Sequence, residues 1–443
     1  MLAISKRTTK ILKALFSIIF NSLFICKILT PGDFTLIKRL FIILAILTTA
    51  VEVSSPVHAS YKIDARAAIM VDASTGQIIY EQNADQQLPV ASISKLLTVT
   101  VVHDELQQRA ITDYSKVTVT PDIAAISNDH SYSSIGLASG QSYPVIELLN
   151  AAMVKSADGA TVALATATGD SLDEFTLKMD QKATAIGLKK AKIINPTGLT
   201  NGEMKTLSSA NVAKNDENAM SAQDVALLTQ YLIHSYPQLL QVTAQKKASF
   251  AITKNNTKSV ENLNKMLTGD QYTVPGVKIN GLKTGTSDHA GACFVSTGNY
   301  KGHQIITVVL HANGHNQDNR FIQTQKLYQM LKNNYRLQSI KLPKDVTNVK
   351  VNHGTKRQMP VTPHRLVIWS NHPLTDYTVS QNFNDHLTKN TQTIQAPIKK
   401  GQRIGSLRLT SAHLKTVSGD PLTYPLYSDE TVRRGNFLAR LFQ

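Results

Sequence analysis

Three short motifs occur in one order along this chain, and their combination constrains its fold and chemistry more than any other feature. The first spans Ser92 to Lys95 (Ser-Ile-Ser-Lys), the second spans Ser156 to Asp158 (Ser-Ala-Asp), and the third spans Lys283 to Gly285 (Lys-Thr-Gly). Each motif alone is weak evidence, because a serine followed three residues later by a lysine is more often a helix cap with a solvated lysine. Together they require a fold that brings three distant segments to one site.

The residue types in these motifs suit nucleophilic catalysis by a serine. Residues i and i+3 share one face of a helix, so we expect the Lys95 amine beside the Ser92 hydroxyl. A desolvated lysine can be the base that a serine needs, and backbone N–H groups at a helix N-terminus point toward the oxyanion that forms on acylation. In a Lys-Thr-Gly strand, Gly285 leaves room for a substrate to lie alongside as an added strand, and Lys283 is available for a carboxylate.

The hydrophobic pattern predicts an α+β domain with strands at both ends and helices between them. The strand signals at 66–72 and 77–81 flank a Gly turn and predict a hairpin. A buried helix is expected from Ala91 onward, with Ser92 at its N-terminus. Further helices are expected at 145–154, 160–167, 172–186, 221–233 and 319–335, and further strands at 277–286, 292–297 and 304–310. The terminal strands are expected to share one antiparallel sheet in a catalytic domain over residues 60–337.

A second, smaller domain is predicted after this one. Beyond Pro343 the sequence changes to short β-type runs that are broken by Asn, His, Gly and Pro. This pattern of short strand-forming runs and turn residues predicts a small all-β domain over residues 343–425.

The first 59 residues are predicted to be a leader that contains a signal peptide. Lys38 and Arg39 precede the apolar run from Leu40 to Val51, and Val57-His58-Ala59 offers a small-residue cleavage site. This order is typical of secretory signals, so we expect the chain to be exported. A membrane-spanning anchor is the alternative, although the apolar run is short for a full crossing.

Charge and cysteine content agree with an exported protein. The chain has 47 basic and 31 acidic residues and a formal net charge of +16, which indicates an anionic environment such as nucleic acid, anionic lipid or cell-wall polymer. The leader favours the wall and the membrane surface over nucleic acid. Of the two cysteines, Cys26 lies in the leader and Cys293 remains, so an intramolecular disulfide is excluded once the leader is removed.

The motifs and their surroundings resemble one family. Residues 61 to about 335 are similar to the low-molecular-mass penicillin-binding proteins, which are serine D-alanyl-D-alanine carboxypeptidases. The resemblance extends beyond the three motifs to the segments 88–92 (Leu-Pro-Val-Ala-Ser), 194–199 (Ile-Asn-Pro-Thr-Gly-Leu) and 276–282 (Gly-Val-Lys-Ile-Asn-Gly-Leu). It implies a DD-peptidase fold in which helices pack on an antiparallel sheet. It also implies a substrate, the peptidoglycan stem peptide ending in D-Ala-D-Ala, and β-lactam antibiotics as inhibitors.

The resemblance also implies roles for catalytic residues. Ser92 would be the acylated nucleophile, Lys95 would accept its proton, and Ser156 would relay protons toward the leaving D-alanine. It implies neither a cofactor nor a metal ion.

The resemblance also implies that four further residues contact the substrate. Lys283 and Thr284 would bind its terminal carboxylate, and the backbone N–H group of Thr286 would complete the oxyanion hole with that of Ser92. Asp158 stands where the family usually has asparagine. An ionised carboxylate there would favour the protonated form of Lys95, and it has no N–H to offer the substrate.

The C-terminal segment 428–443 is predicted to be an amphipathic membrane anchor. On a helical wheel Phe437, Leu438, Leu441 and Phe442 share one face, with Arg433 and Arg440 opposite. Such a helix can lie in the membrane interface. In the alternative interpretation, the tail packs on the β-domain.

Other functions remain open at this stage. A serine β-lactamase would need an acid for deacylation, and the segment Glu261 to Asn264 has a loosely suitable spacing. A zinc peptidase is disfavoured, because the segment His311 to His315 lacks the acid that accompanies a metal-binding helix. A DD-endopeptidase and a catalytically weak, penicillin-binding wall protein are also compatible with the sequence.

Overall fold

The computed structural model describes residues 62–253, 256–267, 269–363, 366–388 and 393–436. The described residues from Lys62 onward form one compact unit. The predicted leader over residues 1–59 lies outside the described residues.

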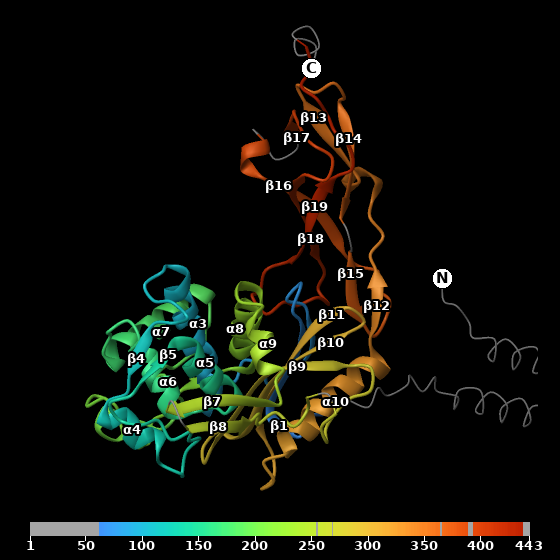
Figure 1. The fold of residues 1–443 in the computed structure, drawn as a ribbon. Helices are drawn as coiled ribbons and strands as arrows, with labels where there is room; N and C mark the ends of the chain where they lie inside the picture. The colour runs from blue at the N-terminus through green and yellow to red at the C-terminus, as the bar shows by residue number, and fades with distance from the viewer. Residues whose placement is uncertain (1–61, 254–255, 268, 364–365, 389–392, 437–443) are drawn as a thin grey trace, which may run out of the picture. The chain divides into compact units, whose positions relative to one another are not determined.

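A five-stranded antiparallel sheet with the order β2-β1-β11-β10-β9 forms the centre of the first part (Figure 1). Its strands are β1 (Ala65–Asp72), β2 (Ile78–Gln82), β9 (Lys278–Ser287), β10 (Gly291–Tyr300) and β11 (His303–Ala312). β1 and β2 form the predicted hairpin, and β1 pairs with β11 in a register that places Ala67 opposite Leu310. The strands at the two ends of this part therefore share one sheet, as predicted.

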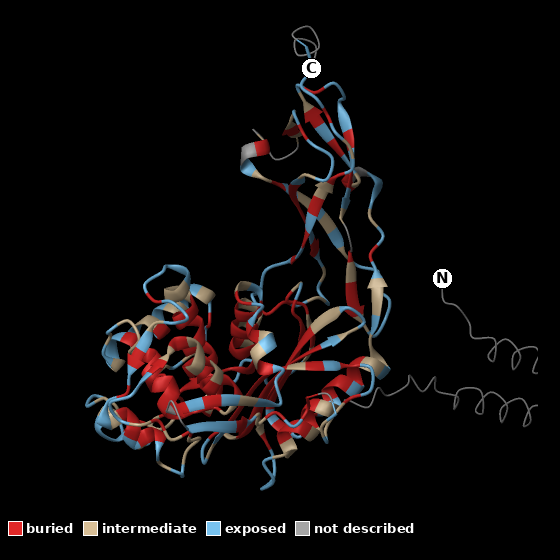
Figure 2. Cartoon of the chain, viewed as in Figure 1, coloured by how far each residue is buried: buried red, intermediate tan, exposed pale blue. Residues whose placement is uncertain are grey.

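Helices cover both faces of this sheet. On one face lies α10 (Asn319–Asn334), and on the other lie α8 (Ala222–Ser235) and α9 (Leu239–Thr243). The remaining helices pack mainly on one another and on α8 and α9, and they are α3 (Lys95–Gln107), α4 (Pro121–Ser127), α5 (Val145–Val154), α6 (Asp158–Ala165) and α7 (Leu172–Ile186). Successive side chains of a strand point to opposite faces. Accordingly Ile69 and Val71 belong to the apolar core that contains α8, whereas Met70 belongs to the core that contains α10. Figure 2 shows these buried residues concentrated along the sheet and the helix faces that pack on it.

Local signals in the sequence set several helix boundaries. The hydroxyl of Ser221 accepts the Asp224 N–H while the Asp224 side chain accepts the Ser221 N–H, which is the predicted capping pair at the start of α8. One expectation was wrong in detail. Ser92 does not open an α-helix, because Ala91–Ser94 form a 3-10 turn (η1) and α3 begins at Lys95.

Short elements connect the sheet and the helices. They are the strand pairs β3 (Leu88–Pro89) with β6 (Ala219–Met220), β4 (Lys116–Thr118) with β5 (Ser142–Pro144), and β7 (Lys247–Thr253) with β8 (Asn256–Glu261), and the 3-10 helix η2 (Gly202–Leu207).

The second part is all-β apart from two short 3-10 turns, among the residues that the structure describes. β12 (Arg336–Ser339) pairs with β15 (Val367–Ser370), and a six-stranded sheet has the order β16-β18-β19-β14-β13-β17. The remaining elements are η3 (Lys344–Val346), β13 (Asn348–Asn352), β14 (Gln358–Pro363), β16 (Thr378–Phe383), η4 (Asp385–Leu387), β17 (Thr393–Gln395), β18 (Arg403–Thr410) and β19 (Leu422–Ser428). These strands enclose an apolar core of their own.

The C-terminal end differs from the prediction. β19 runs to Ser428, Val432 is fully buried and pairs with Ile398, and Arg434 pairs with Gly354. Residues 428–436 therefore extend the β-structure and do not begin the helix that we predicted from residue 428, because burial of Val432 holds this segment in the β-core. Residues 437–443 lie outside the described residues. Within the described ranges, no helix has the length and apolar character that a bilayer crossing requires.

The only tryptophan of the chain, Trp369, lies where β15 contacts the first sheet. Its indole N–H donates to Asp72 Oδ2 at 2.9 Å and its backbone N–H donates to Gln77 Oε1 at 2.9 Å. Its ring stacks on Tyr300 with 5.9 Å between the centroids, and His303 Nδ1 lies 2.7 Å from Asp72 Oδ2. Polar and apolar contacts together fix β15 to the first part.

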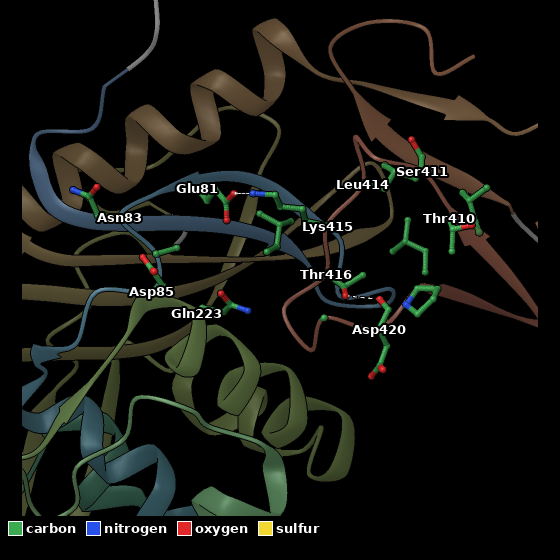
Figure 3. A pocket seen from close by; sticks show the side chains of 16 residues that line it. Glu81, Asn83, Asp85, Gln223, Thr410, Ser411, Leu414, Lys415, Thr416 and Asp420 are labelled. Atoms are coloured by element: carbon green, nitrogen blue, oxygen red, sulfur yellow. Dashed lines mark hydrogen bonds and ion pairs between the residues drawn. The ribbon is translucent and has the colours of Figure 1, made fainter. Parts of the chain in front are cut away.

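The connection between β18 and β19 also contacts the first part, along β2. The backbone N–H of Ile78 donates to the Lys415 carbonyl at 2.8 Å, and the N–H of Val417 donates to the Gly76 carbonyl at 3.0 Å. A cavity of about 800 Å³ opens beside these contacts, where Glu81 forms an ion pair with Lys415 (Figure 3). None of the residues of the three motifs lines this cavity.

Candidate active site

The Lys95 side chain is the centre of the site that the motifs form. It is completely buried, and its Nζ lies 2.7 Å from Ser92 Oγ, 2.7 Å from Asp158 Oδ1 and 2.9 Å from the Thr197 carbonyl oxygen. An ammonium group has three hydrogens to donate, and three acceptors surround this one. The first two motifs therefore meet at Lys95.

A tight loop supplies the third of these acceptors. Asn195 Oδ1 accepts the backbone N–H groups of Thr197 and Gly198, both at 2.9 Å, so one side chain fixes the turn. Gly198 has φ +82°, and a Cβ there would lie 2.0 Å from the carbonyl oxygen of Ala91. Only glycine fits so close to the residue that precedes Ser92. This segment carries part of the family resemblance, but no role was predicted for its residues from the sequence.

Asp158 is the first residue of α6 and is buried. While its Oδ1 contacts Lys95, its Oδ2 accepts the backbone N–H of Ser133 at 3.2 Å. The carboxylate thus lies beside Lys95, as the resemblance suggested, and is held there from its other oxygen.

The third motif reaches the second through its lysine. Lys283 Nζ donates to Ser156 Oγ at 2.7 Å and to the Thr284 carbonyl at 3.0 Å. Ser156 has φ +64°, a left-handed conformation that directs its hydroxyl between the strand and the helices. Lys283 and Thr284 are buried, whereas Thr286 is exposed.

β9 packs closely against the segment that carries Ser92. A Cβ on Gly285 would lie 2.5 Å from the carbonyl oxygen of Val90, so a larger residue would separate the strand from η1. On the other side of the strand, the buried guanidinium of Arg320 donates to the Gly285 carbonyl at 2.8 Å. Arg320 could not be recognised from the sequence, because a single arginine near the start of a predicted helix carries no distinguishing signal.

Burial and neighbouring charges control the charges of the two lysines. Burial lowers the pKa of Lys95, and the charge of Asp158 opposes this effect. Burial also holds the pKa of Lys283 well below its usual value, and the positive charge of Lys95 adds to the effect. Each lysine is therefore closer to releasing a proton than a solvated lysine would be.

The residues named for two other chemistries do not join this site. Glu261 ends β8 with a side chain that is 73% exposed, and it forms an ion pair with Lys247 at 2.9 Å. Among the described residues, no group of three or more His, Cys, Asp and Glu side chains could hold a metal ion.

Comparisons with known proteins agree with this geometry. The family model of the D-alanyl-D-alanine carboxypeptidases matches residues 50–314. The D-alanyl-D-alanine carboxypeptidase DacF of Bacillus subtilis is 26% identical over 383 residues, which cover 85% of this chain and 88% of that protein.

Two solved structures extend the comparison. A peptidoglycan synthesis regulatory factor of Streptococcus pneumoniae, a penicillin-binding protein, is 30% identical with a TM-score of 0.74, and the match covers 84% of this chain and 100% of that one. A penicillin-binding protein of Listeria monocytogenes in its ampicillin-bound form is 25% identical with a TM-score of 0.50, over 61% of this chain and 98% of that one. The chain therefore belongs to the D-alanyl-D-alanine carboxypeptidase family of low-molecular-mass penicillin-binding proteins and is a serine-type peptidase.

Proposed function

We propose that Ser92 is the nucleophile with which this carboxypeptidase removes the terminal D-alanine from peptidoglycan stem peptides. The observation that carries the proposal is the 2.7 Å contact between Ser92 Oγ and the buried amine of Lys95. A serine hydroxyl is a weak nucleophile until a base within hydrogen-bond reach takes its proton. Among the described residues, Lys95 is the only one whose side chain forms a hydrogen bond with Ser92 Oγ and can act as such a base.

Acylation then follows from the arrangement of the three motifs. Neutral Lys95 takes the Ser92 proton as Oγ bonds to the carbonyl carbon of the penultimate D-alanine. Ser156, which contacts Lys283, passes its hydroxyl proton to the nitrogen of the terminal D-alanine as the C–N bond breaks, and it regains a proton from the Lys95 ammonium, which becomes neutral again. Water afterwards hydrolyses the ester, which returns Ser92 and releases the shortened stem peptide.

Positive charge recognises the end of the substrate. Lys283 lies on β9 beside Ser156, and with Thr284 it suits a free terminal carboxylate. The backbone N–H groups of Ser92 and Thr286 form the oxyanion hole in this proposal. The same groups would accept a β-lactam, because its strained amide imitates the scissile bond, and the ampicillin-bound relative supports this part of the proposal.

The test is covalent labelling by a fluorescent penicillin, together with D-alanine release from a peptide ending in Lys-D-Ala-D-Ala. We expect Ser92→Ala to abolish both signals and the neighbouring Ser94→Ala to retain them. Labelling that survives in Ser92→Ala would contradict the assignment. A crosslinked dimeric stem peptide, assayed in parallel, separates carboxypeptidase from endopeptidase activity.

We further propose that the protein is exported and acts at the extracellular face of the cell membrane. The signal-like pattern before residue 60 supports export. The basic pair Arg433-Arg434, followed by Phe437, Leu438, Leu441 and Phe442, supports attachment to an anionic membrane surface through the last residues. Deletion of residues 437–443 leaves buried Val432 in place, so it should release the protein from anionic vesicles without lowering peptide turnover. Unchanged vesicle binding would refute attachment through this segment.

A further inference from the structure

Two adjacent buried residues, Glu217 and Asn218, contact three of the segments that border the candidate active site, although neither belongs to a motif. Glu217 is 6% exposed and Asn218 is fully buried, and they lie directly before β6. We propose that Glu217 and Asn218 are positioning residues, which hold the Ser92 segment, the loop beside Lys95 and the end of β9 in catalytic register. This inference rests on the roles proposed above for Ser92 and Lys95.

Asn218 links the nucleophile segment to the loop beside the base. Its backbone carbonyl accepts the N–H of Val90 at 3.1 Å, two residues before Ser92. Its side-chain oxygen accepts the N–H groups of Ile194 at 2.6 Å and Asn195 at 3.1 Å, and its side-chain nitrogen donates to the Asn195 carbonyl at 2.8 Å. Since Asn195 fixes the turn that presents the Thr197 carbonyl to Lys95, Asn218 sets where that acceptor lies.

Glu217 extends the same linkage to the substrate strand. Its two carboxylate oxygens lie 3.1 Å and 2.8 Å from Ser287 Oγ, and its Oε1 lies 3.1 Å from His289 Nδ1. Ser287 closes β9 on the face of the strand that also carries Lys283 and Gly285. Its hydroxyl accepts the Ala290 N–H at 2.9 Å, so its single proton is directed to Glu217. The carboxylate thereby fixes the end of the strand beside Thr286.

This arrangement ties three segments together through two consecutive residues. A shift of Glu217 displaces β9 relative to Asn218. This displacement changes the distance between the oxyanion N–H groups and the Ser92 hydroxyl. Small displacements of catalytic groups are costly, because proximity and orientation supply a large part of the rate. A residue that only stabilised the fold would change the melting temperature and leave the chemistry of the folded enzyme unaltered.

The test uses the full chain with the variants Glu217→Ala, Glu217→Gln and Ser287→Ala, and measures acylation rate by fluorescent penicillin, kcat and KM for the peptide, and melting temperature. We expect Glu217→Ala to slow acylation and lower kcat at least about ten-fold at temperatures where the variant is fully folded. Glu217→Gln should recover most of this loss, since its amide oxygen still accepts the Ser287 hydroxyl. Asp216→Asn is the matched control, because Asp216 precedes Glu217 but is 41% exposed and pairs with Lys192, and its rates should equal those of the wild type.

Ser287→Ala removes the same contact from the strand side, and it carries the test if Glu217→Ala does not fold. It should slow acylation similarly, with no further loss in the double variant, because the two substitutions break one interaction. An acylation rate within two-fold of the wild-type rate in folded Glu217→Ala, or in Ser287→Ala, would overturn this inference. It would leave the proposed function intact as long as labelling still requires Ser92. If Ser92→Ala, with no other substitution, were labelled like the wild type, the proposed function itself would be overturned.

Discussion

The substitution Asp158→Asn tests how the charge beside Lys95 controls its basicity. In the native protein the Asp158 carboxylate lies 2.7 Å from Lys95 Nζ and opposes the effect of burial, which lowers the pKa of Lys95. Asparagine keeps the shape of the side chain but removes the charge, so burial acts alone and the pKa of Lys95 falls further. More of the lysine is then neutral at a given pH. The rising limb of the acylation rate should therefore move to lower pH, and acylation near neutrality should become faster.

The distance between the two groups gives the scale of this effect. Two unit charges 4 Å apart interact by about 4 kcal/mol at an effective dielectric constant of about 20, and this pair is closer. A ten-fold change in an equilibrium corresponds to about 1.4 kcal/mol, so one third of that interaction already gives a change of about ten-fold. We expect acylation of Asp158→Asn to be at least about ten-fold faster on the rising limb, and equal to the wild type where Lys95 is neutral in both proteins.

The assay is the rate of acylation by a fluorescent penicillin against pH for both proteins. Because loss of one partner of a buried ion pair can cost about 3–5 kcal/mol of stability, melting curves must first show that both proteins are folded throughout the pH range. Asp170→Asn is the control, since Asp170 also lies 2.7 Å from a lysine, Lys178, but outside the motifs. Superimposable profiles for wild type and Asp158→Asn, or a slower asparagine variant, would refute the electrostatic argument.

Two other substitutions give clear expectations. Lys283→Ala should weaken turnover of substrates with a free terminal carboxylate far more than that of amidated analogues, because truncation of a buried charged partner costs about 2–5 kcal/mol; equal losses in kcat/KM for the two substrates would show that Lys283 does not bind the carboxylate. Gly198→Ala should slow acylation and lower the melting temperature more than Gly169→Ala. Both glycines have positive φ, but only at Gly198 would a Cβ meet another atom, the Ala91 carbonyl oxygen at 2.0 Å; equal effects of the two substitutions would exclude this close contact as the cause.

Much of the fold could be predicted because its signals are local. The predicted bounds of α5 and α7 are those observed, and α7 has a capping box at Ser171 and a left-handed Gly187 at its C-terminus. The start of α3 was predicted less well. Hydrophobic periodicity does not distinguish a 3-10 turn from the first turn of an α-helix, and the conformation of Ala91–Ser94 depends on the close contacts of Gly198 and Gly285.

The candidate site was predictable only where side chains carry the signal. Ser92, Lys95, Ser156, Asp158 and Lys283 stand in recognisable motifs, and the structure brings them together. The Thr197 carbonyl next to Lys95 is a backbone group, which leaves no mark in the sequence. The contacts of Arg320 and Glu217 depend on tertiary packing between segments far apart in the chain, so residue spacing could not reveal them.

Trp369 is the single tryptophan of the chain, so emission excited selectively from tryptophan reports on one location. The indole is buried at the contact between β15 and the first sheet, and the chain has no second tryptophan to mask its emission. A red shift of this emission during a denaturant titration would register water entering that contact, whereas far-ultraviolet circular dichroism would register loss of strands and helices throughout the chain. Coincident midpoints would mean that the two parts of the chain unfold as one cooperative unit. An earlier midpoint by fluorescence would mean that the contact at Trp369 opens while the helices and strands of both parts remain folded.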